Sequence, residues 1–106
     1  MIFDITIDGE NFQLDIPEKL LSELRPICED LEKEFDKGLQ MGRYWVDEPD
    51  HFSRCQYAAD KVASAIARED RRMLYTYAAY ILSKAPNLQH ITVDSNYEMQ
   101  EIDLVL

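Results

Sequence analysis

The stretch that decides the fold runs from Met73 to Leu82 and reads MLYTYAAYIL, without a single charged side chain. On a helix, most of its residues form one wide apolar face, and Tyr75, Ala79 and Tyr80 cover most of the remaining surface. A helix that is apolar on nearly every side must be covered on nearly every side, either by the rest of the chain or by a second copy of it. We expect the side that carries Tyr75 and Tyr80 to contact a second subunit.

A second helical pattern precedes this stretch. From His51 onward, apolar and small residues recur at steps of three and four, namely Phe52, Cys55, Ala59, Val62 and Ile66. If this pattern continued without a break to Leu82, the helix would be roughly 50 Å long, which is too long for a compact domain of this size. We therefore expect a break near Arg68 to Asp70, with Asp70 as the cap of the next helix, and an antiparallel helix pair.

The first helical run contains a proline. After Pro17, apolar residues recur at helical spacing from Leu20 to Phe35, and Pro26 lies inside this run. A proline within a helix removes an amide donor, so the pattern predicts a short helix from Glu18 to Arg25, followed by a kink or a restart. The whole chain is thus expected to contain three to four helices.

The N-terminal residues predict a β-hairpin. Met1 to Ile16 alternates apolar and polar side chains around Asp8-Gly9, a two-residue turn signal of type I′. With that turn at the centre, the expected pairs are Ile7 with Glu10, Ile5 with Phe12, Phe3 with Leu14, and Met1 with Ile16. This register places the large apolar side chains on one face of the hairpin.

The C-terminal residues predict a second hairpin. Gln89 to Asp94 alternates as a strand, and Asp94-Ser95-Asn96 suits a three-residue loop. That loop would pair Val93 with Tyr97 and Ile91 with Met99, with a bulge near Gln100. Two terminal hairpins around a helical middle indicate a single α+β domain over residues 1–106, with a four-stranded antiparallel sheet and helices on one of its faces.

The composition is strongly acidic. The formal net charge is −10, the isoelectric point is about 4.5, and most of the excess negative charge lies before Ser53. Such a field repels phosphate backbones and anionic lipid, so we expect neither nucleic acid nor a membrane as a partner. A basic protein partner is compatible with this charge.

Two further features indicate the compartment. The start of the chain lacks the basic and apolar regions of a secretory signal, and no apolar run reaches the roughly 18 to 20 residues of a membrane helix. Cys28 and Cys55 both fall at core-type helical positions, where reduced thiols are expected in the absence of an export signal. We interpret the protein as cytoplasmic.

Charged residues on two successive helices predict pairing within the fold. Arg54, Lys61 and Arg68 recur every two helical turns, and Glu29, Glu32 and Asp36 make a matching acidic stripe on the preceding helix. The basic stripe taken alone would suggest an anion-binding or nucleic-acid-binding face. Because the net charge opposes such a face, ion pairs between the two helices are the better interpretation.

The connection from Gly38 to Asp50 reads GLQMGRYWVDEPD and places Arg43, Tyr44 and Trp45 side by side. Residues of these types often anchor protein interfaces and ligand pockets. The alternative is that Trp45 folds back as a lid on the core. The glycines do not indicate a phosphate-binding loop, because no Lys-Ser or Lys-Thr pair follows them.

Asp47, His51 and Cys55 follow one another at helical steps and could share one face. They would then form a thiolate–imidazole pair oriented by a carboxylate, or three ligands of a metal. In the alternative interpretation Asp47 begins the helix as its cap, His51 is solvated and Cys55 packs in the apolar seam. Asp47, Glu48 and Asp50 do not match a calcium-binding loop, and helix capping accounts for them without a cation.

No nucleophile with a base, metal-ligand set or cofactor fingerprint emerges, so we assign no catalytic residue, metal or cofactor. The favoured interpretation is a non-enzymatic protein-interaction module that forms a homodimer through the tyrosine-rich helix. It would contact a protein partner through Arg43, Tyr44 and Trp45 or through the acidic helix. The alternative is a small-molecule-binding protein or enzyme with a pocket under the 38–50 loop, using Asp47, His51 and Cys55.

Overall fold

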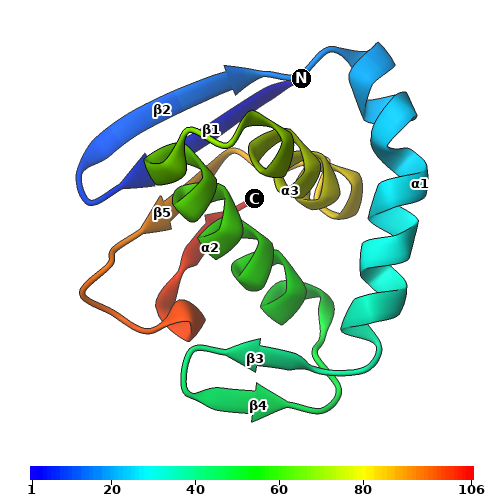
Figure 1. Ribbon diagram of the computed structural model, residues 1–106. Coiled ribbons are helices and arrows are strands. Elements are labelled where there is room, and N and C mark those ends of the chain that lie inside the picture. The colour runs from blue at the N-terminus through cyan, green and yellow to red at the C-terminus, as the bar shows by residue number, and fades with distance from the viewer.

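The computed structural model describes residues 1–106 as an α+β fold with three helices, a mixed four-stranded sheet and a separate two-stranded sheet (Figure 1). The four-stranded sheet has the order β2-β1-β5-β6, and β3 pairs with β4. In chain order the elements are β1 (Ile2–Ile7), β2 (Glu10–Asp15), α1 (Glu18–Phe35), β3 (Leu39–Met41), β4 (Tyr44–Val46), α2 (His51–Arg68), α3 (Arg71–Lys84), β5 (His90–Val93), the 3-10 helix η1 (Met99–Glu101) and β6 (Asp103–Val105).

The predicted N-terminal hairpin is confirmed, including its register. Ile7 pairs with Glu10, Ile5 with Phe12 and Phe3 with Leu14, and the amide of Ile16 donates to the Met1 carbonyl at 2.8 Å. Asp8 and Gly9 both have positive φ, 51° and 84°, as a type I′ turn requires. Turn chemistry and alternation together specify this register.

The prediction of an all-antiparallel sheet is wrong. β1 and β5 lie side by side in parallel, with Ile5 opposite Ile91 and Ile7 opposite Val93, and only the outer strands β2 and β6 run antiparallel to their neighbours. Everything from β2 to α3 forms the crossover between these two parallel strands, as parallel pairing requires a long connection. Figure 1 shows α2 and α3 in front of the sheet, and Phe3, Ile5 and Ile91 are buried beneath them.

The predicted tight C-terminal hairpin is also wrong. β5 pairs with β6, so that Ile91 lies opposite Leu104 rather than Met99, and residues 94–102 form a longer loop that contains η1. The buried side chain of Gln56 explains the difference. Its amide donates to the carbonyls of Gln100 at 2.8 Å and Ile102 at 3.0 Å, which holds the loop against α2.

The first helix is continuous, so the predicted end at Arg25 with a restart after Pro26 is wrong. α1 runs from Glu18 to Phe35 with Pro26 inside it. A proline at this position has no N–H to donate to the carbonyl of Ser22, but both residues are exposed, so water can satisfy that carbonyl. The cost of the missing hydrogen bond is therefore small enough for the apolar face of α1 to outweigh it.

The break between α2 and α3 is confirmed at the predicted residues. α2 ends at Arg68, Glu69 adopts the left-handed conformation, and Asp70 caps α3 by accepting the amide of Met73 at 3.1 Å. The chain reverses there, so the two helices pack against each other as the predicted pair.

The tyrosine-rich stretch forms the centre of α3; its second half, from Ala78 to Leu82, is buried within a single chain, and its first half is partly buried. Ala79 and Tyr80 are fully buried, and the Tyr80 ring packs edge to face on Phe35 of α1 with centroids 5.1 Å apart. The expectation that a second subunit covers this side of the helix is therefore wrong for Ala79 and Tyr80. Of the three residues on that side, Tyr75 alone keeps part of its surface open, and α1 packs against α3 beside it.

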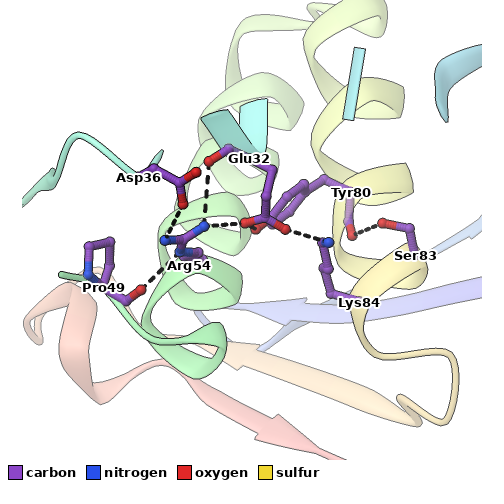
Figure 2. Close-up of polar contacts among 7 residues, drawn as sticks. All are labelled: Glu32, Asp36, Pro49, Arg54, Tyr80, Ser83 and Lys84. Atoms are coloured by element: carbon purple, nitrogen blue, oxygen red, sulfur yellow. Dashed lines mark hydrogen bonds and ion pairs between the residues drawn. The ribbon is translucent and has the colours of Figure 1, made fainter. Parts of the chain in front are cut away.

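One carboxylate lies where the three helices meet (Figure 2). Glu32 on α1 accepts hydrogen bonds from the Arg54 guanidinium of α2 and, at 3.0 Å, from the Tyr80 hydroxyl of α3, and its other oxygen forms an ion pair with Lys84. Arg54 also donates to Asp36 at 2.9 Å. The predicted pairing between the acidic and basic stripes is thus confirmed for Arg54.

The Glu32 network changes the ionisation of its members. Burial opposes the charged form of Glu32, but hydrogen bonds from Lys84, Arg54 and Tyr80 outweigh it and hold the pKa of this carboxyl below its ordinary value. Burial and the Glu32 carboxylate together raise the pKa of Tyr80. Both shifts keep the carboxylate charged and the phenol protonated at neutral pH.

We expect Glu32→Ala to lower the free energy of unfolding at neutral pH by about 2 kcal/mol, because it leaves two partly buried cations without their shared anion. The folded-state pKa of Glu32 is depressed, so its contribution is present above the ordinary value of 4.5 and is lost as the pH falls through the folded pKa. Urea unfolding should therefore show a difference between the two proteins that shrinks in acid. The exposed Asp30→Ala on the same helix is the control and should change stability by less than about 0.5 kcal/mol. An equal effect of the two substitutions would contradict the structural importance of Glu32.

Candidate functional site

The connection between α1 and α2 is an ordered hairpin rather than the long loop expected from the sequence. β3 and β4 pair Leu39 with Val46 and Met41 with Tyr44, and Gly42 has the positive φ of a tight turn. Leu39 and Met41 are buried in the main core. One face of the hairpin is thereby attached to the domain, and the other carries Gln40 and Trp45 toward solvent.

Side chains from distant parts of the chain hold the tip of this hairpin. Arg43 donates to Glu98 at 2.7 Å, and the Gln100 amide donates to the Met41 carbonyl at 3.1 Å. The Gln40 side chain closes the turn by donating to the Gly42 carbonyl at 2.9 Å. The 94–102 loop, itself docked on α2, therefore sets the position of the hairpin.

Trp45 lies on the outer face of the hairpin in a defined orientation. Its indole N–H donates to Asp47 at 2.7 Å, and its ring lies so close to Gly38 that a Cβ there would overlap it. Even so, 57% of Trp45 is exposed, so it does not serve as a lid on the core. The neighbouring Tyr44 is equally exposed. Arg43, Tyr44 and Trp45 define what we call the hairpin surface.

Acidic residues follow the hairpin surface. Asp47, Glu48 and Asp50 are all exposed, and Asp50 is the helix cap, accepting the Ser53 amide at 2.7 Å. That backbone hydrogen bond lowers the pKa of Asp50. The assignment of the cap to Asp47 is therefore wrong, since Asp47 is engaged by the indole of Trp45 instead.

The structure brings together only two of the three candidate catalytic residues. His51 and Cys55 line a small apolar pocket of about 230 Å³ with side chains from α3 and the C-terminal strand. Asp47 does not line this pocket, and the pocket is not formed by the 38–50 loop. Burial and the Glu32 charge raise the pKa of the Cys55 thiol to about 11, so the thiol is protonated at neutral pH.

Tyr75 and Tyr80, the two residues expected at a subunit interface, have different environments. Tyr80 is buried in the Glu32 network, whereas Tyr75 borders a shallow groove between α1 and α3 that Arg71 and Arg72 also line. Leu20, Leu24 and the partly exposed Ile27 line the α1 side of that groove. Tyr75 is therefore the one of these two tyrosines that a second subunit can reach.

No sequence pattern indicated the residues that position the hairpin surface. Glu98 and Gln100 reach Arg43 and Met41 across more than half of the chain, and no local pattern marks such contacts. For the position of the Trp45 ring the sequence held one signal, Gly38, because a glycine lets a ring pack closely on the backbone.

Comparison with protein-family models, with curated proteins and with solved structures finds no match to this chain. None of its helices combines the length and apolarity needed to cross a bilayer. No group of three or more His, Cys, Asp and Glu side chains is arranged to hold a metal ion.

We expect both thiols to react slowly with iodoacetamide in the folded protein. Burial raises the pKa of Cys28 and of Cys55, and at a pKa of about 11 only about one Cys55 thiol in ten thousand is ionised at neutral pH. Mass spectrometry should show both cysteines unlabelled in the native state and labelled in denaturant. Faster labelling of native Cys55 than of a free thiol would instead support the thiolate–imidazole alternative.

Proposed function

We propose that this chain is a cytoplasmic, non-enzymatic protein-interaction module and that the hairpin surface is where it binds a partner. The observation that carries the proposal is Trp45, which is 57% exposed although hydrogen bonds and backbone packing hold it in place. An exposed aromatic side chain with no role in the core is typical of an interface anchor.

The way the hairpin is held favours binding. Ordering a mobile side chain at an interface costs roughly 0.5–1.5 kcal/mol, and a residue that is already ordered avoids most of that cost. The Trp45–Asp47 hydrogen bond and the Arg43–Glu98 ion pair supply this order before a partner arrives. The hairpin surface is therefore pre-organised for its partner.

The surroundings of Trp45 indicate the chemistry of that partner. Asp47, Glu48 and Asp50 lie next in the chain, and the protein as a whole carries a net charge of −10. The indole N–H is already occupied by Asp47, which leaves the apolar part of the ring for contact. A partner with an apolar pocket bordered by Lys or Arg fits this arrangement best.

The catalytic alternative has less support. Cys55 is buried and protonated, and Asp47 is committed to Trp45 rather than to His51. A nucleophile must be ionised or paired with an oriented base, and neither condition is met at this pair.

We expect Trp45→Ala to weaken partner binding by about thirtyfold or more, as truncation of an interface anchor does. Tagged wild-type and variant proteins would be used to capture partners from cells, and the captured proteins compared by mass spectrometry. Ile2→Ser is the matched control, because Ile2 is exposed to the same extent on the outer face of the sheet. A partner bound by wild type and by Ile2→Ser but lost with Trp45→Ala supports the proposal. Identical capture by all three proteins overturns it.

We also propose that the homodimer, if formed through the tyrosine-rich helix, uses the groove beside Tyr75. Light scattering at several concentrations should then give the mass of a dimer, and Tyr75→Ala should shift it toward that of a monomer, because it removes the aromatic side chain from the interface. Wild type that remains a monomer at every concentration would contradict this homodimer.

A further inference from the structure

The outer edge of the sheet at β2 has unused backbone hydrogen-bonding groups. Met1 and Ile16 exchange both of their backbone hydrogen bonds at 2.8 Å, so every second pair along this ladder does the same. Glu10, Phe12 and Leu14 therefore direct their N–H and C=O groups toward β1. Asn11, Gln13 and Asp15 direct theirs away from the sheet, where no strand lies beyond β2 (Figure 1).

This edge lacks the devices that usually protect an exposed strand. Proteins blunt free edges with short strands, prolines, bulges or a central lysine. The opposite edge strand, β6, is only 3 residues long, whereas β2 has 6 residues in an unbroken register and no proline or lysine. Its central residues Asn11, Phe12, Gln13 and Leu14 carry no charge. β2 is thus the edge suited to receive a strand.

An apolar cleft lies on the inner face of the same strand. Its volume is about 490 Å³, and Phe12 and Leu14 of β2 face Ile66 and Leu74 of α2 and α3 across it. A strand added to β2 would direct alternate side chains into this cleft. The opposite side chains would lie on the polar face beside Asn11, whose amide donates to Asp4 at 2.8 Å.

The charged residues around this edge indicate which kind of strand binds to β2. Glu10 and Asp15 mark the two ends of β2, and Glu69 and Asp70 border the cleft, with Arg71 as the one base among the residues that line it. A second copy pairing antiparallel would have to place outward-directed residues opposite each other, such as Gln13 opposite Gln13 and Asn11 opposite Asp15, and its equal net charge of −10 opposes that approach. A basic segment has the complementary charge.

We infer that β2 and this cleft bind an extended segment of a basic protein, one with alternating apolar and Lys or Arg side chains. The segment adds a fifth strand to the sheet through the backbone groups of Asn11, Gln13 and Asp15. Its apolar side chains fill the cleft, and its basic side chains lie on the opposite face of the sheet, where Asp15 is. This surface is separate from the hairpin surface and does not depend on the function proposed for it.

The test uses a synthetic peptide, Lys-Val-Lys-Val-Lys-Val, and its acidic counterpart, Glu-Val-Glu-Val-Glu-Val. Amide hydrogen exchange measured by NMR should show Asn11, Gln13 and Asp15 exchanging rapidly in the free protein and becoming protected with the basic peptide. Glu10, Phe12 and Leu14 should be slow in both states. The acidic peptide should give no protection.

Gln13→Pro is the decisive variant. It removes one amide donor from the free edge without removing a bond to β1, so the hairpin should fold while peptide affinity falls by about tenfold or more. Gln13→Ala removes only an exposed side chain and should bind like wild type. A circular dichroism spectrum unchanged from wild type confirms that each variant is folded.

Three results with the peptides would overturn the inference. They are the absence of binding by the basic peptide at millimolar concentration, equal binding of the two peptides, and undiminished binding by folded Gln13→Pro. Protection of the three edge amides on concentrating the protein alone would likewise overturn it, in favour of pairing between two copies.

Discussion

The architecture depends on one carboxylate that three helices share. Glu32 comes from α1, its hydrogen-bond donors Arg54 and Tyr80 come from α2 and α3, and Lys84 completes the set from the end of α3. A partly buried charge is tolerated only when its partners are all in place, so this network permits one arrangement of the three helices. It also accounts for the burial of the tyrosine-rich stretch, since Tyr80 needs α1 both as an apolar cover and as a hydrogen-bond acceptor.

The same network extends to the hairpin surface. Arg54 donates to the carbonyl of Pro49 at 2.9 Å, directly before α2, and so ties the exit of the hairpin to α1 (Figure 2). At the other end, Arg43 and Met41 are held by the loop that Gln56 docks on α2. α2 therefore serves as the common support, and Trp45 is exposed on an element fixed at both ends.

The two proposed binding surfaces share a chemical logic although they lie on different elements. Each presents apolar side chains, Trp45 in one case and Phe12 with Leu14 in the other, beside exposed carboxylates. The strong net negative charge acts over both, so basic partners approach faster and acidic ones are repelled. A small domain with two such surfaces has room to contact two partners, or two parts of one.

Local chemistry in the sequence determined much of the fold. The Asp8-Gly9 turn and the alternation around it specify the first hairpin, Asp70 marks the start of α3, and matching charge stripes predict the pairing of Arg54 with Glu32. Residue type alone also indicates Arg43, Tyr44 and Trp45 as interface residues. Only the tertiary structure decided that β1 and β5 are parallel neighbours and that Tyr80 is buried while Trp45 is exposed. It also decided that Gln56 binds the loop before β6 through the Ile102 carbonyl. The reason is physical: periodicity and turn preference act over a few residues, whereas strand order and burial depend on contacts between residues far apart in the chain.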